Sequence, residues 1–181
     1  MTPAIDAQGW LSGARRIVSP NCDERPEGSV VDMVVIHSIS LPPGRFGGDG
    51  VERLFTNRCD PAADPCFEEL QHMRVSAHFF IRRDGELVQF VPCRQRAWHA
   101  GVSRWQGRER CNDFSIGIEL EGGDDWPYEA AQYRSLKLIL AQLAQHFPIR
   151  HLLGHCHIAP ERKTDPGPFF DWEAVGGAPT V

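Results

Sequence analysis

The sequence predicts one α/β domain with a central mixed β-sheet flanked by helices. Three segments predict strands of that sheet: a β-branched run at residues 30–36, an Asp-Gly hairpin at residues 77–91 and an alternating stretch at residues 114–121. Residues 129–147 repeat apolar side chains at three- and four-residue steps, which predicts a long helix packed on the sheet. The chain has 181 residues, of which 41% are hydrophobic, so it can bury one core and we expect residues 1–181 to form a single domain.

The start of the chain supplies a lead-in and a first strand. Residues 1–28 are mostly polar or small, so we expect them to lie across the surface with Trp10 as an anchor. Residues 30–36 follow as a buried central strand, with His37 at its end. A polar residue at the point where a central strand leaves the core often belongs to a functional site. A core histidine with one backbone hydrogen bond explains the same position.

A loop and two short helices are expected next. Residues 41–50 contain too much glycine and proline for regular structure and predict a loop beside the strand end. Helices are expected at residues 50–55 and 64–72. Asp64 and Pro65 suit the start of the second helix, because an N-cap carboxylate accepts a backbone N–H and proline has none to leave unpaired.

The clearest local motif is at residues 77–91, where two strand-like runs flank Asp84 and Gly85. Asp-Gly is favoured in tight hairpin turns because both residues tolerate positive φ. The outgoing strand leads to Trp98 and His99, followed by alanine and glycine. An aromatic ring and an imidazole beside small residues suit the wall of a cleft, although a core position explains Trp98 equally well.

The strand at residues 114–121 has one apolar face and one polar face. The polar face carries Ser115, Gly117, Glu119 and Glu121. If this face meets solvent, Glu119 is an ordinary surface carboxylate. If it forms the floor of a cleft, Gly117 leaves room and Glu119 becomes a desolvated carboxylate whose pKa moves towards neutrality.

The last third of the chain begins with the long helix. Residues 129–147 bury an apolar stripe and end before Pro148, so we assign this helix a structural role. Residues 149–153 return as a strand that leads directly to His155. Residues 174–181 are expected to form a tail.

Charge and composition exclude several kinds of partner. The formal net charge is −5 and the sequence pI is about 5.9, so the chain lacks the basic surface that nucleic acids and anionic membranes require. The start has no apolar signal segment, and no run approaches the ~20 apolar residues of a membrane span. We therefore expect a cytoplasmic protein with six reduced cysteines, and no obligate protein partner is evident from the sequence.

Residues 153–168 concentrate groups that bind metals. His155 and Asp165 lie in a segment stiffened by three prolines, and rigid donors lose little conformational entropy on binding. A catalytic zinc usually takes three protein ligands and keeps one position open. His37, which follows another central strand, is the leading third ligand. The competing histidines are His78, His99, His151 and His157.

Several motifs, in order and at matching separations, resemble one enzyme family. The motifs are VIHSISLPPG at residues 35–44, RVSAH at 74–78, RAWHAGVS at 96–103, GRERCNDFSIGIELEG at 107–122, GHC at 154–156 and KTDPGP at 163–168. Together they resemble the zinc-dependent 1,6-anhydro-N-acetylmuramoyl-L-alanine amidases of Gram-negative cell-wall recycling. Their superfamily also includes the peptidoglycan recognition proteins. The resemblance runs from about residue 9 to residue 172.

The resemblance implies a zinc amidase. His37, His155 and Asp165 would bind one zinc ion, which lowers the pKa of a bound water and polarises the scissile carbonyl. That water would be the nucleophile, with Glu119 as general base and acid and Lys163 stabilising the oxyanion. The bond cleaved would join the lactyl group of 1,6-anhydro-N-acetylmuramic acid to L-alanine in anhydro-muropeptides. The alternative for Lys163 is an exposed surface amine.

The resemblance also implies a set of substrate-binding residues: Ser38, Arg74, Trp98 and Arg110. Because stem peptides are acidic, the two arginines are expected to pair with carboxylates, although structural salt bridges explain each of them as well. Two positions depart from the family pattern, since Ser38 replaces a common asparagine and His157 a common aspartate. The first affects one substrate hydrogen bond. The second alters loop packing or offers an additional metal donor.

Two other functions share part of this pattern. A muropeptide-binding module of the same fold without hydrolytic activity typically lacks one or more of the metal ligands. This chain has all three ligands together with Glu119 and Lys163. A non-haem iron oxygenase also uses two histidines and one carboxylate, but it predicts bound iron and oxygen-dependent turnover. The amidase is therefore the function we expect.

Overall fold

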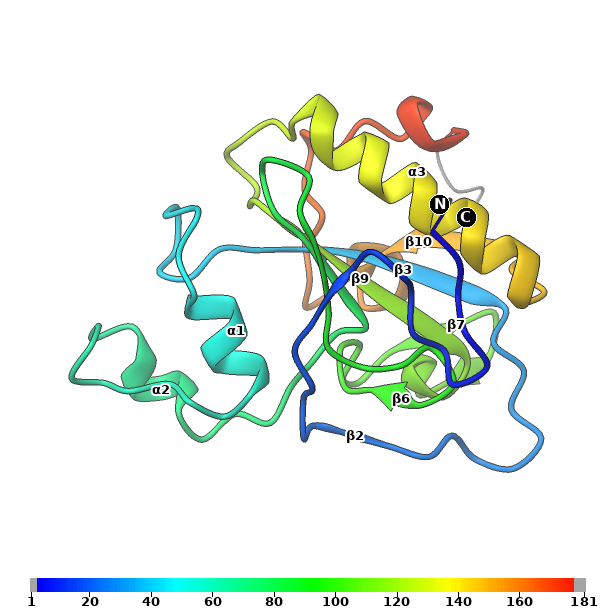
Figure 1. Cartoon of the computed structure of the whole chain (residues 1–181), viewed down its shortest axis with the longest axis horizontal. Coiled ribbons are helices and arrows are strands. Elements are labelled where there is room, and N and C mark those ends of the chain that lie inside the picture. Colours follow the sequence, from blue (N-terminus) through cyan, green and yellow to red (C-terminus); the bar gives the residue numbers. More distant parts are fainter. Residues whose placement is uncertain (1–2, 178–181) are drawn as a thin grey trace.

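The structure, a computed structural model, describes residues 3–177 and contains a mixed six-stranded sheet flanked by helices (Figure 1). The sheet has the order β1-β5-β4-β9-β3-β10. Its strands are β1 (Arg15–Arg16), β3 (Met33–Ile39), β4 (Phe79–Ile81), β5 (Leu87–Gln89), β9 (Ser115–Glu121) and β10 (His151–Gly154). The predicted α/β class is confirmed.

Short elements complete the fold. Two two-stranded ladders pair β2 (Cys22–Asp23) with β6 (Arg96–Ala97), and β7 (Arg104–Trp105) with β8 (Arg108–Glu109). The helices are α1 (Gly50–Phe55), α2 (Phe67–Leu70), α3 (Ala130–His146), α4 (His155–Ile158) and the 3-10 turns η1 (Cys111–Phe114) and η2 (Glu173–Val175). Of the expected tail at residues 174–181, residues 178–181 lie outside the described part of the chain.

β3 and β9 form the centre of the sheet. They pair in parallel over all seven residues of each strand. The strand predicted at residues 30–36 is displaced along the chain: Val30 is 56% exposed, and pairing begins at Met33, where β9 first offers a partner. His37 therefore lies inside the strand rather than beyond its end. Its backbone is paired with β9, one residue after the pairing of β3 with β10 ends at Ile36.

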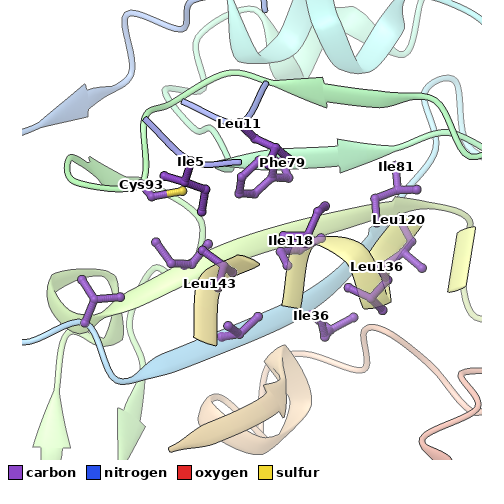
Figure 2. Packing of buried hydrophobic residues seen from close by; sticks show 14 of the residues in the cluster. Ile5, Leu11, Ile36, Phe79, Ile81, Cys93, Ile118, Leu120, Leu136 and Leu143 are labelled. Carbon is purple, nitrogen blue, oxygen red and sulfur yellow. The ribbon is translucent and has the colours of Figure 1, made fainter. Parts of the chain in front are cut away.

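α3 covers one face of the sheet, as Figure 1 shows. In Figure 2 its Leu136 and Leu143 lie against Ile36 of β3 and Ile118 of β9. Full burial of each such side chain contributes roughly 1.5–3 kcal/mol. The helix predicted at residues 129–147 is confirmed, with one residue at each end acting as a cap.

The opposite face of the sheet carries polar side chains. Since side chains alternate along a strand, His37 and Glu119 point away from the face that carries Ile36 and Ile118. The segment that runs from β6 to η1 packs on this second face, where Ala100 joins a cluster with β3 and β10 side chains. The fold thus separates a structural face under α3 from a face where chemistry can be built.

The hairpin predicted at residues 77–91 is confirmed as β4 and β5, with Gly85 at φ 90° in the turn. The loop at residues 41–50 and the helix α1 are also confirmed. α2 is shorter than predicted. The Asp64 carboxylate accepts the Cys66 N–H at 2.9 Å, so it caps a turn that precedes the helix rather than the helix itself.

The N-terminal segment, which we expected to lie across the surface, also contributes to the sheet and to the core. β1 pairs in parallel with β5 and extends the sheet by one strand. Ile5 and Leu11 are buried in the main cluster (Figure 2). Further along, the Arg25 guanidinium donates to the carbonyls of Asn112 and Ser115, each at 2.9 Å, and burial lowers its pKa to about 10. A strand of only two residues and isolated side chains make these contacts, so no strand or helix pattern predicted them.

All six cysteines lie in the described part of the chain and are unpaired, as the composition predicted. Within residues 3–177, no helix combines the length and the apolar character that crossing a membrane requires.

Candidate metal centre and catalytic groups

Three potential metal ligands converge on the polar face of the sheet. His37 projects from β3, His155 is the first residue of α4, and Asp165 lies on the following segment. The His37 Nδ1 atom is 3.0 Å from both His155 Nδ1 and Asp165 Oδ2, and His155 Nδ1 is 3.2 Å from Asp165 Oδ2. Residues far apart in sequence therefore direct three donor atoms to one point.

Parallel pairing explains why the two histidines meet. β10 lies beside β3, with Gly154 opposite Ile36, so both strands deliver a histidine at the next position. Within residues 153–168, the last two residues of β10 lead directly into the short helix α4. A Cβ on Gly154 would lie 2.6 Å from Pro166 Cδ, so only glycine lets the Asp165 segment approach this closely.

The donor set fits a divalent metal. His155 Nε2 lies 3.0 Å from the Ala100 carbonyl, which can only accept a hydrogen bond, so the proton is on Nε2 and the Nδ1 lone pair faces the other donors. Burial lowers the pKa of His37 to about 4. Burial works to raise the pKa of Asp165, but contacts with His155 and His37 hold it below its ordinary value. Neutral imidazoles and an ionised carboxylate are the forms that bind zinc.

Glu119 lies directly beside this cluster. It is the β9 partner of His37 in the parallel register, and only 8% of its surface is exposed. Its Oε2 atom is buried without a hydrogen-bond partner among the described residues. Burial and then Asp165 raise the pKa of Glu119 well above its ordinary value, and Lys163 partly offsets them. The polar face of β9 is therefore a desolvated floor rather than a solvent-facing surface.

Lys163 lies close enough to the cluster for its charge to lower the pKa values of His37 and Glu119. Its side chain is half-buried, and its backbone N–H donates to the Ala159 carbonyl at 3.0 Å, which continues the turn after α4. An amine held at the edge of a desolvated site differs from the freely exposed lysine that is the usual case.

His157 is turned away from the donor atoms. Its Nδ1 accepts the Gly154 N–H at 2.8 Å, and its ring packs against Trp172 at a centroid distance of 5.4 Å. It thus supplies the hydrogen-bond acceptor that an aspartate would supply at the start of α4. Of the two expected effects of this departure, the structure supports loop packing, because the cluster of donor atoms does not include His157.

The four expected substrate-binding residues lie outside the cluster of donor atoms. Ser38 follows His37 on β3. Burial raises the pKa of Tyr128, and the side chain of Ser38 partly offsets this rise. The Trp98 Nε1–H donates to Asp23 at 3.2 Å. Arg74 and Arg110 are exposed.

The two arginines make only local contacts in the described structure. Arg74 donates to the carbonyls of Gln71 and Met73, at 3.0 and 2.9 Å. The Arg110 Nε atom lies 3.5 Å from Asp113. The structure therefore does not join either guanidinium to the metal ligands, and both remain available to a bound molecule.

Sequence reasoning missed two residues beside the cluster. The sequence indicates His99 only as a competing ligand or as part of a cleft wall, yet its Nδ1 lies 2.9 Å from His37 Nε2. No sequence pattern indicates Tyr128. Its hydroxyl donates to the Pro166 carbonyl at 2.7 Å, which ties the Asp165 segment to the start of α3. The Trp-His pair beside small residues was the one available signal for His99.

The free energy of unfolding of the metal-free protein is expected to fall as the pH drops below about 6.5, the ordinary histidine pKa. Burial lowers the pKa of His78 to about 3. Between these two values the unfolded chain binds a proton that the folded chain excludes, so acid favours unfolding. Urea unfolding of His78→Gln at several pH values should give a shallower slope than wild type. The exposed His72→Gln should keep the wild-type slope, and an unchanged slope in His78→Gln would contradict this assignment.

Comparison with known proteins assigns a family. Residues 27–168 match the model of the N-acetylmuramoyl-L-alanine amidase family. The 1,6-anhydro-N-acetylmuramyl-L-alanine amidase AmpD of Escherichia coli K12 is 59% identical over 167 residues, which cover 91% of each chain. A crystal structure of a selenomethionine AmpD derivative matches with a TM-score of 0.90 at 57% identity, covering 92% of this chain and 94% of that one.

A more distant relative was solved with a bound molecule. It is the Escherichia coli amidase AmiD, described as a complex with the substrate anhydro-N-acetylmuramic acid-L-Ala-D-gamma-Glu-L-Lys. It matches with a TM-score of 0.62 at 26% identity, covering 98% of this chain and 67% of that one. The family resemblance seen in the sequence motifs is confirmed by these matches. The chain belongs to the N-acetylmuramoyl-L-alanine amidase family.

Proposed function

We propose that the protein hydrolyses the amide between the lactyl group of 1,6-anhydro-N-acetylmuramic acid and L-alanine in anhydro-muropeptides, as a step of peptidoglycan recycling. The observation that carries this proposal is the convergence of His37, His155 and Asp165 beside the buried carboxylate of Glu119. The names of the AmpD relatives and the molecule bound to AmiD support the same substrate class.

One zinc ion held by His37, His155 and Asp165 would polarise the scissile carbonyl and make water a better nucleophile. Two imidazole nitrogens and one carboxylate oxygen are a common ligand set for catalytic zinc. The tautomer of His155 and the ionised carboxylate of Asp165 both direct lone pairs to the same point. A metal ion at that point can accept all of these lone pairs, whereas one proton cannot.

Glu119 is suited to move the proton. A carboxyl whose pKa is shifted towards neutrality can accept a proton from the attacking water and release it to the departing amine of L-alanine. Its Oε2 atom has no competing hydrogen-bond partner in the described chain, so it is available for this transfer. The Lys163 ammonium would stabilise the oxyanion of the tetrahedral intermediate, and loss of such a donor costs about 10²–10³-fold in kcat.

Two measurements test the proposal against its rivals. Metal analysis should give one zinc per chain, and mass spectrometry should find free peptide and sugar products from anhydro-muropeptides without a requirement for oxygen. Binding of muropeptide without products would indicate the non-catalytic module. Bound iron with oxygen-dependent turnover would indicate an oxygenase. Intact murein sacculi in a parallel reaction would define whether polymeric substrate is cleaved.

Arg74→Ala combined with Arg110→Ala is expected to raise KM for anhydro-muropeptides about 10-fold or more while kcat changes little. Hydrogen bonds between charged groups contribute about 1.5–3 kcal/mol, and 1.4 kcal/mol corresponds to a factor of ten in affinity. Steady-state kinetics on a full-length stem peptide measures the effect. Arg134→Ala, an exposed position on α3 across the sheet from the site, is the matched control. Unchanged kinetics in the double variant would assign both arginines to structure.

A further inference from the structure

We propose that His99 is a positioning residue that orients His37 towards the metal through a directional relay of hydrogen bonds. The relay runs from His37 through His99 and Ser115 to the carbonyl of Cys111. The inference rests on the proposed metal centre and adds to it a residue outside the ligand set.

The far end of the relay sets its direction. The Cys111 carbonyl can only accept, so the Ser115 hydroxyl, 2.6 Å away, donates its single proton there. The Ser115 oxygen must then accept from its other neighbour. That neighbour is His99 Nε2 at 3.2 Å, which therefore carries a proton.

The metal end of the relay demands the same direction. When the His37 Nδ1 atom binds a metal, the ring proton of His37 must be on Nε2. That N–H points at His99 Nδ1, 2.9 Å away, which must be an acceptor. A neutral His99 with its proton on Nε2 meets both conditions, so the two ends of the relay agree on one tautomer for each ring.

The surrounding chain holds the His99 ring in this place. The rings of His37 and His99 meet edge to face, with centroids 5.0 Å apart. A Cβ on Gly117 would lie 2.4 Å from His99 Cγ, so the ring packs directly on the β9 backbone. The Asn112 side-chain oxygen accepts the backbone N–H of His99 at 3.1 Å. The ring is therefore fixed from its backbone, its face and both nitrogens.

The two histidine ligands are oriented by different partners. His155 donates its Nε2 proton to a backbone carbonyl, whereas His37 donates to a side chain that a substitution can replace. Partners that orient metal-ligating histidines typically contribute 10–100-fold in metal affinity. The role of His99 can therefore be tested by substitution, whereas the backbone carbonyl that orients His155 cannot be replaced in this way.

Two amide substitutions separate the two nitrogens of His99. Asparagine can place an amide oxygen near the position of Nδ1, so His99→Asn retains an acceptor for His37. Glutamine reaches the position of Nε2, so His99→Gln retains a contact to Ser115 but not the acceptor. We expect His99→Gln to lose 10–100-fold in Zn²⁺ affinity, measured by chelator competition, and His99→Asn to stay within a few fold of wild type. Equal affinities in both variants, or the reverse order, would overturn the proposal.

A second measurement uses the unmodified protein. Nitrogen-15 NMR of the histidine side chains should find the His99 proton on Nε2, both in the zinc-loaded and in the metal-free protein, because Ser115 fixes it in each. A proton on Nδ1 would overturn the relay even if neither variant folds. Wild-type protein that binds no zinc would instead contradict the proposed metal centre, so the two failures are distinguishable.

Discussion

Glu119→Ala is expected to lower kcat for anhydro-muropeptide hydrolysis by about 10³-fold, within the 10²–10⁴-fold range of general acid–base catalysis, while one zinc per chain is retained. The physical reason is that Glu119 neighbours the ligand His37 in the sheet register but is outside the converging donor set. Removing its carboxylate removes the group that moves the proton and leaves the metal ligands intact. Single-turnover kinetics with metal analysis on the same sample measures both quantities.

A second variant separates the proton transfer from packing. Glu119→Gln has nearly the same volume but cannot accept a proton, so it should be as inactive as Glu119→Ala. Burial raises the pKa of Glu119 well above its ordinary value, and its Oε2 atom has no hydrogen-bond partner in the described structure, so the ionised carboxylate costs folding free energy. Glu119→Gln should therefore unfold at or above the wild-type temperature. The exposed Glu109→Gln should keep full activity. Full activity in Glu119→Ala would mean that a different group is the base.

His37→Ala is expected to abolish both zinc binding and hydrolysis. His37 is 2% exposed and contributes one of three donor atoms that lie 3.0–3.2 Å apart, so the remaining pair would hold the metal far more weakly. The loss of affinity should exceed the roughly 100-fold that removal of an orienting partner costs. Chelator competition and product analysis, with zinc in excess, measure the two effects.

His151→Ala is the matched control for His37→Ala. His151 stands on the neighbouring strand β10, and its ring packs against Trp105 with centroids 5.9 Å apart, outside the donor set. It should keep zinc and activity. A His37→Ala protein that still contained one zinc per chain would show that the metal is held elsewhere.

Local sequence patterns predicted the strands and the helix whose buried side chains recur at regular intervals. The alternation of β9, the Asp-Gly turn and the periodicity of α3 each describe contacts made within or beside a continuous segment. The contribution of the N-terminal segment to the core gave no such signal, because it depends on an edge strand of two residues and on isolated side chains such as Leu11. No periodicity can emerge from so few positions.

The site was predictable only in part for a related reason. The proline-stiffened segment after β10 indicated His155 and Asp165 as metal ligands. The choice of His37 among several histidines needed the family resemblance. The deciding fact is that β10 and β9 flank β3, and this order is a long-range property of the sheet. The roles of His99 and Tyr128 depend on contacts across the same face, and neither position carries a spacing signal.

The N-terminal segment also bears on how the protein can be trimmed for study. The family match begins at residue 27, yet β1 covers the edge of β5 and Arg25 donates to the carbonyls around η1. A fragment limited to residues 27–168 would leave that strand edge open, and open edges template pairing with other chains. We expect such a fragment to self-associate, so useful expression boundaries follow the edge of the sheet rather than the span of family similarity.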